Sequence, residues 1–360
     1  MNYIMNAADI IISTINQNGP ISFRDFMEIA LYHPEYGYYT SPGDKIGQNG
    51  DFYTSPFVTS SFGNMIAKQI LEMWDQLDEP EFTIVEYGAG TGILCRDILN
   101  YIKTNIHSDK YLNYFIIEKS PSLRATQATI VPGEVKWVDS LSEMNPFTGC
   151  VLSNEVVDNF PVHQVYMERQ LKEVYIDHTA VFKEILEPAP TSLKEYLDQL
   201  NISLPQGTRA EINLDAIKWL KEISTVLEKG FVLTIDYGYP AASLYQRSQG
   251  TLVCYHKHQR NYCPYINIGT QDITTHVNFS ALKHWGIKNG LQYSGYTSQT
   301  YFLLGMGLTN EYRQNETNHS PTNFLKTFLI EMGSRIKVLI QHKGIIPRTL
   351  SGLKFPLAVL

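Results

Sequence analysis

The sequence predicts an α/β fold with a largely parallel sheet and helices on both of its faces. Three observations predict it. Apolar segments of strand length alternate with segments of helical spacing from Phe82 onward, and a glycine-rich turn follows the first such strand. Hydrophobic residues make up 43% of the 360 residues and charged residues 18%, which is the balance of a folded globular chain. Strands separated by helices imply crossover connections, and therefore a parallel sheet.

The first block, residues 1–78, is predicted to hold helices and one aromatic loop. Apolar residues recur at helical spacing in Ala8–Ile15, in Phe23–Leu31 with Ser22 as its cap, and in Phe62–Asp75. The segment between the last two helices is dense in Gly, Pro, Asp and aromatic residues, and such loops usually have a functional reason to be ordered. We expect it to cover a substrate or cofactor. The residues expected to do so are Gly50, Asp51, Phe52, Thr54 and Pro56.

The second block, residues 79–155, contains the first half of the predicted core. Its apolar runs are too short for helices and are bounded by turn residues, so they read as buried strands. The expected strands are Phe82–Tyr87, Tyr114–Glu118, Val135–Val138 and Cys150–Ser153. Helices are expected from the glycine turn to about Ile106 and from Ser120 to about Thr129.

The remaining blocks are an insertion, residues 156–210, and the second half of the core, residues 211–360. Within the insertion, Val165–Met167 and Val174–Ile176 flank a polar turn and predict a hairpin. The expected later elements are a helix at Ile212–Glu228, a strand at Phe231–Asp236, a loop at Tyr237–Val277, a helix at Ala281–Asn289, a strand at Tyr301–Leu304 and a closing helix at Asn323–His342.

Charge and cysteine content exclude several classes of partner. The chain has 29 Lys and Arg against 36 Asp and Glu, a net charge of −7, so it lacks the basic field that holds a nucleic-acid backbone. Its four cysteines are dispersed, which predicts reduced thiols rather than a disulfide framework. The N-terminus shows no signal or transit peptide pattern and no run of about 20 apolar residues occurs. We expect a cytoplasmic protein without a membrane span.

The glycine turn is the first functional motif. Gly88-Ala89-Gly90-Thr91-Gly92 lies between a strand and a helix, where backbone can approach a ligand and free amides point at it. Ile93 stands where a dinucleotide site would have its last glycine, and no Gly-Lys-Ser/Thr follows as in a phosphate-binding loop. The alternative is a simple tight turn.

Acidic residues around this turn indicate which ligand it takes. Glu118 ends the next strand, where a carboxylate can hold a ribose diol. Glu86 precedes the turn and would repel a pyrophosphate but suits a cationic or amino-bearing ligand. S-adenosylmethionine has the sulfonium, the amino group and the ribose that fit. Asp139, after the third strand, is the candidate for an adenine contact.

The second motif, Asn154, Glu155 and Asp158, directly follows the fourth strand. Ligands of open α/β sheets bind outside the carboxyl ends of the strands, so these residues are expected at the mouth of the cofactor site. Asn154 is assigned to the cofactor, and Glu155 and Asp158 to catalysis. For Asp158 the alternative is a cap on the following helix.

Two further segments contain histidines. Cys254, His256, His258 and Cys263 carry zinc-ligand side chains, but their spacing matches no usual zinc pattern, and we expect no metal. His276 is a candidate base, with a purely hydrogen-bonding role as its alternative.

Taken together, these motifs resemble the MidA family of S-adenosylmethionine-dependent methyltransferases over nearly the whole chain. The stretches that carry the resemblance are Tyr32–Tyr39, Gly47–Pro56, Glu86–Gly92, Ser153–Val162, Asp236–Tyr239 and Gln271–Phe279. The resemblance implies a class I, Rossmann-like methyltransferase sheet. Mitochondrial members of this family are complex I assembly factors that methylate an arginine of a complex I subunit. The resemblance therefore implies a protein substrate, which in a bacterial member could be a respiratory complex I subunit.

The resemblance also gives the second motif a chemical role. Arginine methyltransferases carry two acidic residues after the fourth strand, and Glu155 and Asp158 are similar in placement. A carboxylate there would orient a guanidinium, which stays protonated at any working pH. Two alternatives stay open: a methyltransferase for a small-molecule or lysine amine, with His276 as base, and a non-catalytic assembly chaperone that keeps the cofactor fold.

Overall fold

The computed structural model describes residues 5–43, 45–47, 50–51, 55–106, 109–309, 333–357 and 360. The chain forms two compact units, each made of several chain segments. Unit 1 contains residues 1–52, 157–218 and 239–281, and unit 2 contains residues 53–156, 219–238 and 282–360. Because the chain passes repeatedly between them, residues close in sequence, such as Glu155 and Asp158, belong to different units.

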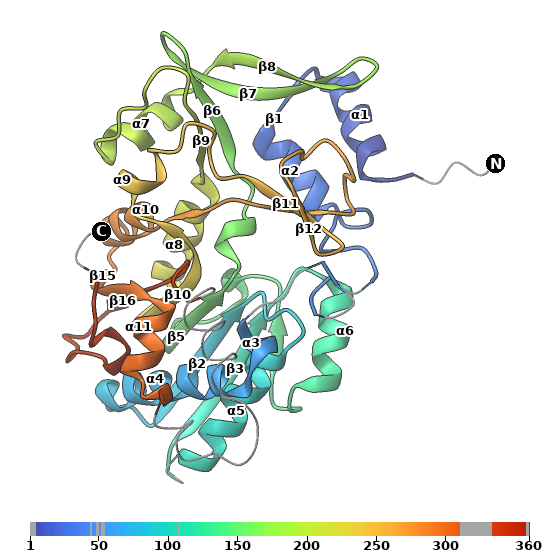
Figure 1. The fold of residues 1–360 in the computed structure, drawn as a ribbon. Helices are drawn as coiled ribbons and strands as arrows, with labels where there is room; N and C mark the ends of the chain where they lie inside the picture. Colours follow the sequence, from blue (N-terminus) through green and yellow to red (C-terminus); the bar gives the residue numbers. More distant parts are fainter. Residues whose placement is uncertain are drawn as a thin grey trace. The chain divides into compact units, whose positions relative to one another are not determined.

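Unit 2 is built on a mostly parallel sheet, and Figure 1 labels all of its strands named below except β4. Its strand order is β15-β16-β10-β5-β2-β3-β4, and β10, β5, β2, β3 and β4 run parallel. β2 has β3 on one side and β5 on the other, so the order reverses at β2, which is where open α/β sheets bind their ligands. The strands are β2 (Glu81–Tyr87), β3 (Tyr111–Ile117), β4 (Lys136–Val138), β5 (Phe147–Asn154), β10 (Leu227–Tyr239), β15 (Gln292–Ser298) and β16 (Ile336–Lys343).

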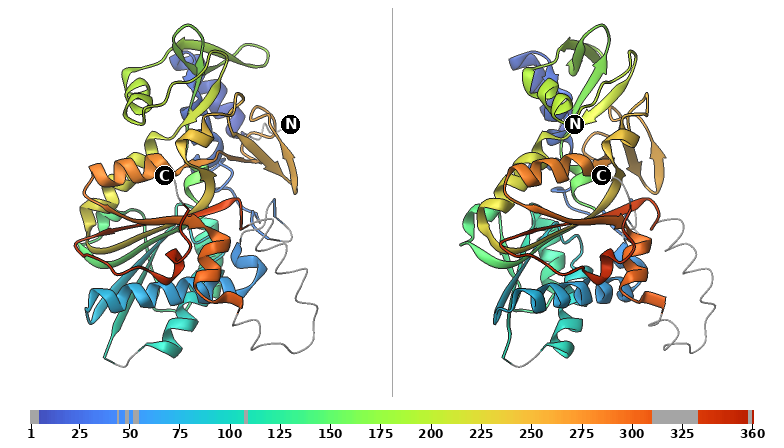
Figure 2. Two further views of the ribbon diagram at one scale, coloured as in Figure 1. Left: turned by 60° about the vertical axis from the view of Figure 1, so that its left-hand side comes forward. Right: turned by 90° about the vertical axis from the view of Figure 1, so that its left-hand side faces the viewer.

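Helices cover this sheet on both faces, as Figure 2 shows for α4 and α5 on one side and α8 on the other. Apolar side chains of α4 and α5 form one core with alternate residues of the strands, such as Ile84 and Leu233. On the opposite face, Trp219 of α8 packs edge-on against Tyr87 of β2. The helices are α3 (Ser55–Val58), α4 (Ser60–Leu77), α5 (Ile93–Asn105), α6 (Pro121–Ile130), α8 (Leu214–Val226), α10 (Phe279–Lys288) and α11 (Gln299–Gly305), with short 3-10 turns η1 (Leu141–Glu143) and η4 (Ser351–Leu353).

These elements confirm the predicted α/β class and most of the predicted strands and helices. Two elements near the C-terminus were predicted wrongly. Tyr301–Leu304 lies in α11, which Ser298 caps by accepting a hydrogen bond from the Tyr301 amide at 3.2 Å. The closing helix is contradicted from Ile336 onward, because Ile336–Lys343 is strand β16, antiparallel to β10 and β15. Nearly every residue of β16 is buried, so its sequence shows no alternation that would mark a strand.

Unit 1 combines two antiparallel sheets with helices α1 and α2. The larger sheet has the order β1-β7-β6-β9, with β8 on the other edge of β7, and the smaller has the order β12-β11-β13. The predicted hairpin is confirmed as β6 and β7, whereas the predicted loop 237–277 contains β11, β12 and β13. The elements are α1 (Ala7–Asn18), β1 (Ile21–Ser22), α2 (Phe23–Tyr32), η2 (Val157–Asn159), β6 (His163–Met167), β7 (Leu171–His178), β8 (Phe182–Pro188), α7 (Thr191–Gln199), β9 (Arg209–Ile212), α9 (Ala241–Leu244), β11 (Val253–His256), β12 (Gln259–Asn261), β13 (Asp272–Thr274) and β14 (Val277–Asn278).

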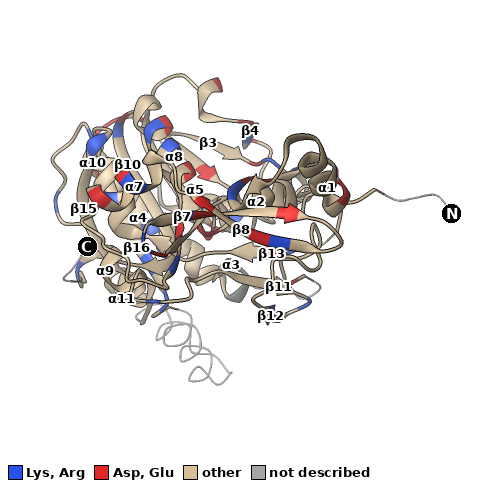
Figure 3. Ribbon diagram, turned by 90° about the horizontal axis from the view of Figure 1, so that it is seen from above, with Lys and Arg blue, Asp and Glu red and all other residues tan. Residues whose placement is uncertain are grey.

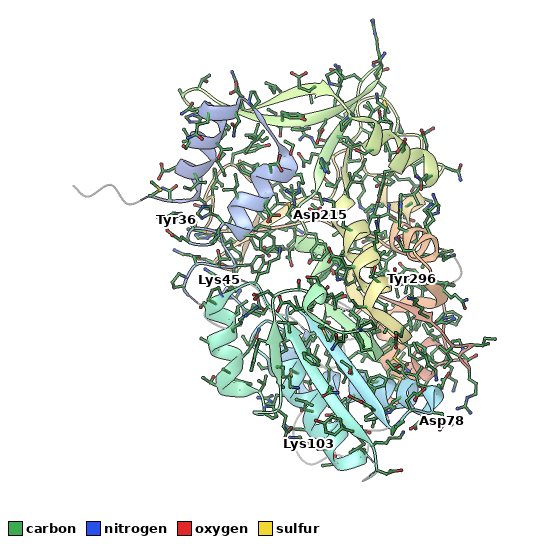
Figure 4. All side chains as sticks on the ribbon, turned by 180° about the vertical axis from the view of Figure 1, so that it is seen from behind. Tyr36, Lys45, Asp78, Lys103, Asp215 and Tyr296 are labelled. Atoms are coloured by element: carbon green, nitrogen blue, oxygen red, sulfur yellow. The ribbon has the colours of Figure 1, made fainter. Side chains whose placement is uncertain are left out.

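Side chains tie the segments of unit 1 together although they are far apart in sequence. Ser22 caps α2 as predicted, accepting from the Asp25 amide. Arg24 of α2 forms an ion pair with Asp215 at 2.8 Å, and Asp215 is labelled in Figure 4. Phe26 of α2 packs on the rings of Phe182 and Tyr265. Aromatic packing thus joins α2 to the insertion at Phe182, and the ion pair joins α2 to the start of α8 at Asp215.

Basic and acidic residues are interspersed over the described elements, as Figure 3 shows. Lys and Arg residues do not gather on one element there. Within the described ranges, no helix has both the length and the apolar character needed to cross a membrane.

Candidate active site

The glycine turn of unit 2 has the backbone geometry of a ligand-binding loop. Gly88, Gly90 and Gly92 have φ of +58°, +56° and +87°, a left-handed region that residues with a Cβ seldom adopt. Gly92 is also the N-cap of α5, and no described side chain caps that helix. The first amides of α5 are therefore available to a ligand beside β2.

Glu118 lies just beyond β3 with both carboxylate oxygens already oriented. One oxygen accepts a hydrogen bond from the Ser120 amide and the other from the Gln127 side chain, both at 3.0 Å. The side-chain amide of Gln127 also donates to the Gly90 carbonyl at 2.8 Å, which links Glu118 to the glycine turn. Burial raises the pKa of Glu118. Each of its oxygens keeps acceptor capacity for a vicinal diol.

Glu86 lies in β2 and is only 2% exposed. Its carboxylate accepts a hydrogen bond from the Tyr114 hydroxyl at 2.7 Å. Burial raises its pKa to about 7, and the charge of Glu118 adds to that shift. The contact of Glu86 with an amino-bearing ligand stays a prediction. When ionised, a buried carboxyl group of this kind can offset the positive charge of a cationic ligand.

Asp139 follows β4 and is a surface residue. It forms an ion pair with Arg124, and 79% of its side chain is exposed. Its predicted adenine contact stays a prediction, and any such contact would compete with Arg124.

Glu155 directly follows strand β5, in a turn held by hydrogen bonds. Its Oε1 accepts hydrogen bonds from the Ser55 amide at 3.1 Å and from the Asn154 side chain at 3.3 Å. Loss of solvation raises the pKa of Glu155 to about 7, the Ser55 hydrogen bond opposes the shift, and the charge of Asp236 adds to it. Among the described residues nothing donates a hydrogen bond to Oε2. That oxygen is available to an acceptor group.

The predicted residues of unit 2 converge at the carboxyl ends of β2, β3 and β5. A Cβ on Gly88 would lie 3.0 Å from the Val156 side chain, so the glycine turn packs directly against the turn of Glu155. Asn154 carries a buried side-chain oxygen that has no hydrogen-bond partner among the described residues. An unsatisfied acceptor beside the glycine turn suits an amino-bearing ligand.

Asp158 and His276, the other predicted catalytic residues, belong to unit 1. Asp158 is buried in η2, and its carbonyl accepts from the Thr275 amide at 2.9 Å. The His276 ring packs on Tyr239 at 5.3 Å between centroids, and its amide donates to Thr251. Within unit 1, Asp158 and His276 thus lie on adjoining segments.

The predicted covering loop is held within unit 1 by tyrosine and aspartate pairs. Tyr38 donates to Asp51, and Tyr39 donates to Asp272, both at 2.7 Å. Burial raises the pKa of Asp272 to about 7, and the charge of Asp51 adds to it. The ammonium of Lys45, labelled in Figure 4, lies 5.0 Å from the centre of the Tyr38 ring.

The other predicted residues of this loop are distributed differently. Gly50 packs closely on the Lys45 backbone, where an added Cβ would clash with the carbonyl oxygen. Pro56 lies in α3 of unit 2, and Phe52 and Thr54 lie outside the described residues.

The cysteine and histidine segment has no metal-binding arrangement in the described part of the chain. Cys254 is buried and Cys263 exposed, and His256 contacts the Thr270 carbonyl at 2.8 Å.

Three residues of the unit 2 site were missed from the sequence. Gln127 occupies the inward position of α6, and a polar residue at the apolar spacing of Leu123 and Ile130 was the available signal. Ser55 and Asp236 lie inside the motifs of the family resemblance but were assigned no role. Their importance arises from hydrogen bonds between a backbone amide and a carboxylate far away in sequence, which sequence spacing does not reveal.

The comparisons with known proteins agree with this site. A family model described as "Putative S-adenosyl-L-methionine-dependent methyltransferase" matches residues 65–297, which is more than half of the chain. The chain belongs to this methyltransferase family. The match confirms the resemblance to the MidA family and makes the protein a methyltransferase dependent on S-adenosylmethionine.

Named relatives cover most of the methyltransferase chain. The "Protein arginine methyltransferase NDUFAF7 homolog, mitochondrial" of Drosophila melanogaster is 26% identical, covering 95% of this chain and 85% of its own. The human "Protein arginine methyltransferase NDUFAF7, mitochondrial" is also 26% identical, covering 82% of this chain and 71% of its own.

Solved structures resemble the whole methyltransferase chain. A protein from Burkholderia thailandensis, crystallised bound to S-adenosyl-homocysteine, has a TM-score of 0.87 and 30% identity, covering 97% of this chain and 94% of its own. A native crystal structure from the same organism has a TM-score of 0.83 and 29% identity, with the same coverage. The predicted cofactor is thereby confirmed, and the glycine turn, Glu118 and the Asn154 oxygen have the chemistry to bind it.

Proposed function

We propose that this methyltransferase modifies an arginine side chain of a protein. The observation that carries the proposal is Glu155, a carboxyl group fixed at the carboxyl end of β5 beside the glycine turn. The names of the relatives support the acceptor class, since they are protein arginine methyltransferases.

The geometry of Glu155 suits a guanidinium. Because Oε1 is engaged by Ser55 and Asn154, the acceptor nitrogen would donate to Oε2. A carboxylate there holds positive charge at one part of the guanidinium and orients another nitrogen for attack. S-adenosylmethionine supplies the electrophilic methyl group. The chain supplies orientation, charge and exclusion of water.

The pKa of Glu155 gives this proposal a pH dependence. The carboxyl group is protonated below about pH 7 and ionised above it. Only the ionised form attracts a guanidinium, so single-turnover transfer should rise as pH increases through about 7.

We also propose the partner and the location as hypotheses for test. Resemblance to the MidA family supports a respiratory complex I subunit as the first acceptor to try, and dispersed cysteines support a cytoplasmic location. Cell fractionation of the tagged protein tests the location.

The experiment for the acceptor class is single-turnover transfer to an arginine-containing protein, with cofactor affinity measured separately. Glu155→Gln keeps the Oε1 acceptor and removes the charge. It should leave cofactor affinity nearly unchanged and slow transfer by roughly 10²-fold, since one electrostatic partner in a dry site contributes about 2.7–4 kcal/mol.

Glu134→Gln is the matched control, because Glu134 is a surface residue paired with Lys103. It should transfer at the wild-type rate. Wild-type transfer by Glu155→Gln would rule out the arginine mechanism and favour a neutral amine acceptor with His276 as base. Absence of cofactor binding by the wild-type protein would favour the chaperone alternative.

A further inference from the structure

Glu155 adopts a backbone conformation that an isolated glutamate would avoid. Its φ is +54°, in the left-handed region that favours glycine. A non-glycine residue stays there only where its surroundings determine the conformation, and such residues cluster at functional sites. Other residues of unit 2 must therefore hold this turn.

Asp236 of β10 binds the residue that follows this turn. It is fully buried, and its two carboxylate oxygens accept from two backbone amides, Val156 at 3.1 Å and Tyr237 at 2.7 Å. The Glu155 amide itself donates to the Ile235 carbonyl at 2.8 Å. Val156, the residue after Glu155, is therefore attached to β10 through the Asp236 carboxylate.

We propose that Asp236 is a positioning residue of this methyltransferase, which fixes the Glu155 turn through the Val156 amide and acts on the Glu155 carboxyl through its own charge. The inference rests on the proposed role of Glu155 in methyl transfer. Asp236 needs no contact with substrate or cofactor to do this, because both effects pass through the protein.

Among the groups around Glu155 that are named below, Asp236 is the one whose charge affects the pKa of Glu155. α3 contributes the amide of Ser55, β5 contributes the neutral Asn154, and Ser55 is hydrogen-bonded in turn to the neutral Gln299 of α11. β10 contributes Asp236, which raises the pKa of Glu155 beyond the effect of burial.

On β16, Lys337 stands opposite Asp236 in register. The Lys337 ammonium donates to the carbonyls of Ser334 and Arg335, and burial lowers its pKa to about 8. Below that pH, Lys337 is a cation on β16, which lies on the opposite side of β10 from β5.

The test measures Glu155 directly and needs no methyl acceptor. Carboxyl carbons of glutamate are labelled with ¹³C in the full chain, and the Glu155 signal, assigned by its loss in Glu155→Gln, is titrated by NMR. Asp236→Asn should lower the proton affinity of Glu155 by roughly tenfold, about one pKa unit, because the like charge is gone while the shape is kept. The Val156 amide should also lose protection from hydrogen exchange.

Asp75→Asn is the control for loss of one carboxylate, since Asp75 is a surface partner of Lys110. It should leave the Glu155 titration unchanged. An unchanged titration in folded Asp236→Asn would overturn the inference, whatever the methyl acceptor proves to be.

The inference stays testable if Asp236→Asn does not fold. Asp236→Ser, whose hydroxyl can still accept one amide hydrogen bond, then replaces it with the same expected titration. Rapid exchange of the Val156 amide in the folded wild-type protein would also overturn the proposed attachment. A failed arginine assay would leave both readouts intact, so the two proposals can fail separately.

Discussion

The two units use their carboxylates in different ways. In unit 2, Glu118 and Glu155 follow parallel strands and accept hydrogen bonds from backbone and side-chain amides. In unit 1, Asp51 and Asp272 accept from tyrosine hydroxyls that belong to a loop of the same unit. Glu118 and Glu155 keep acceptor capacity for a ligand, whereas Asp51 and Asp272 bind protein segments together. The difference assigns cofactor chemistry to unit 2.

The largest effect should come from blocking the glycine turn. Gly90 has φ of +56°, so Gly90→Val forces a β-branched residue into a left-handed backbone beside the ligand. We expect S-adenosyl-homocysteine affinity to fall at least 100-fold while the fold persists. Calorimetric titration measures it. Gly133→Val, at a site where an added Cβ would have nothing within 4 Å, is the control and should bind normally.

A smaller effect is expected from replacing Glu86, a buried carboxyl group of unit 2. The folded-state pKa of Glu86 is about 7 and its ordinary value is 4.5, so the folded protein holds a proton that the unfolded chain has lost between these values. The free energy of unfolding should therefore decrease as pH rises from 5 to 8 in cofactor-free protein. Glu86→Gln lacks the part of this pH dependence that arises from the Glu86 proton.

Relative to wild type, the free energy of unfolding of Glu86→Gln should rise by roughly 2.5 kcal/mol from pH 5 to pH 8, at about 1.4 kcal/mol per pKa unit. Urea unfolding at several pH values measures it. Glu81→Gln, an exposed position of the same strand, should show the wild-type slope. A wild-type slope in Glu86→Gln would mean that Glu86 is ionised throughout.

The smallest effect concerns unit 1. Tyr39→Phe removes the hydroxyl that donates to Asp272 and should lower the free energy of unfolding by about 1–3 kcal/mol, because a buried carboxyl loses a donor. Cofactor affinity should not change. Tyr262→Phe, at a ring that is 64% exposed, is the control. A large loss of cofactor affinity in Tyr39→Phe would contradict the division of roles between the units.

The sequence predicted unit 2 far better than unit 1. The alternation of strands and helices, together with Gly88–Gly92, was sufficient to predict the parallel sheet. Because the carboxyl ends of such strands lie at one edge of a sheet, the residues that follow them could be predicted to lie together. Unit 1 depends on pairings such as Tyr39 with Asp272, which lie 233 positions apart and follow no spacing rule. Asp236 could not be assigned for a similar reason, because its partners are backbone amides, one of them in the turn that follows β5.

The C-terminal errors have a different physical cause. The run Tyr301–Leu304 is apolar and short, and periodicity alone does not separate a buried strand from one helical turn. The Ser298 cap decided in favour of a helix. For Ile336–Lys343, burial between two neighbouring strands removed the alternation that an exposed face would have left.

The most direct test of the central claim is hydrogen–deuterium exchange of the full chain with and without S-adenosyl-homocysteine. If unit 2 carries the cofactor site, exchange should slow in residues 86–92, 118–127 and 154–156, and hardly change in the β7 and β8 hairpin, residues 171–188. Unchanged exchange in those three segments at a saturating ligand concentration, or protection confined to unit 1, would contradict the account.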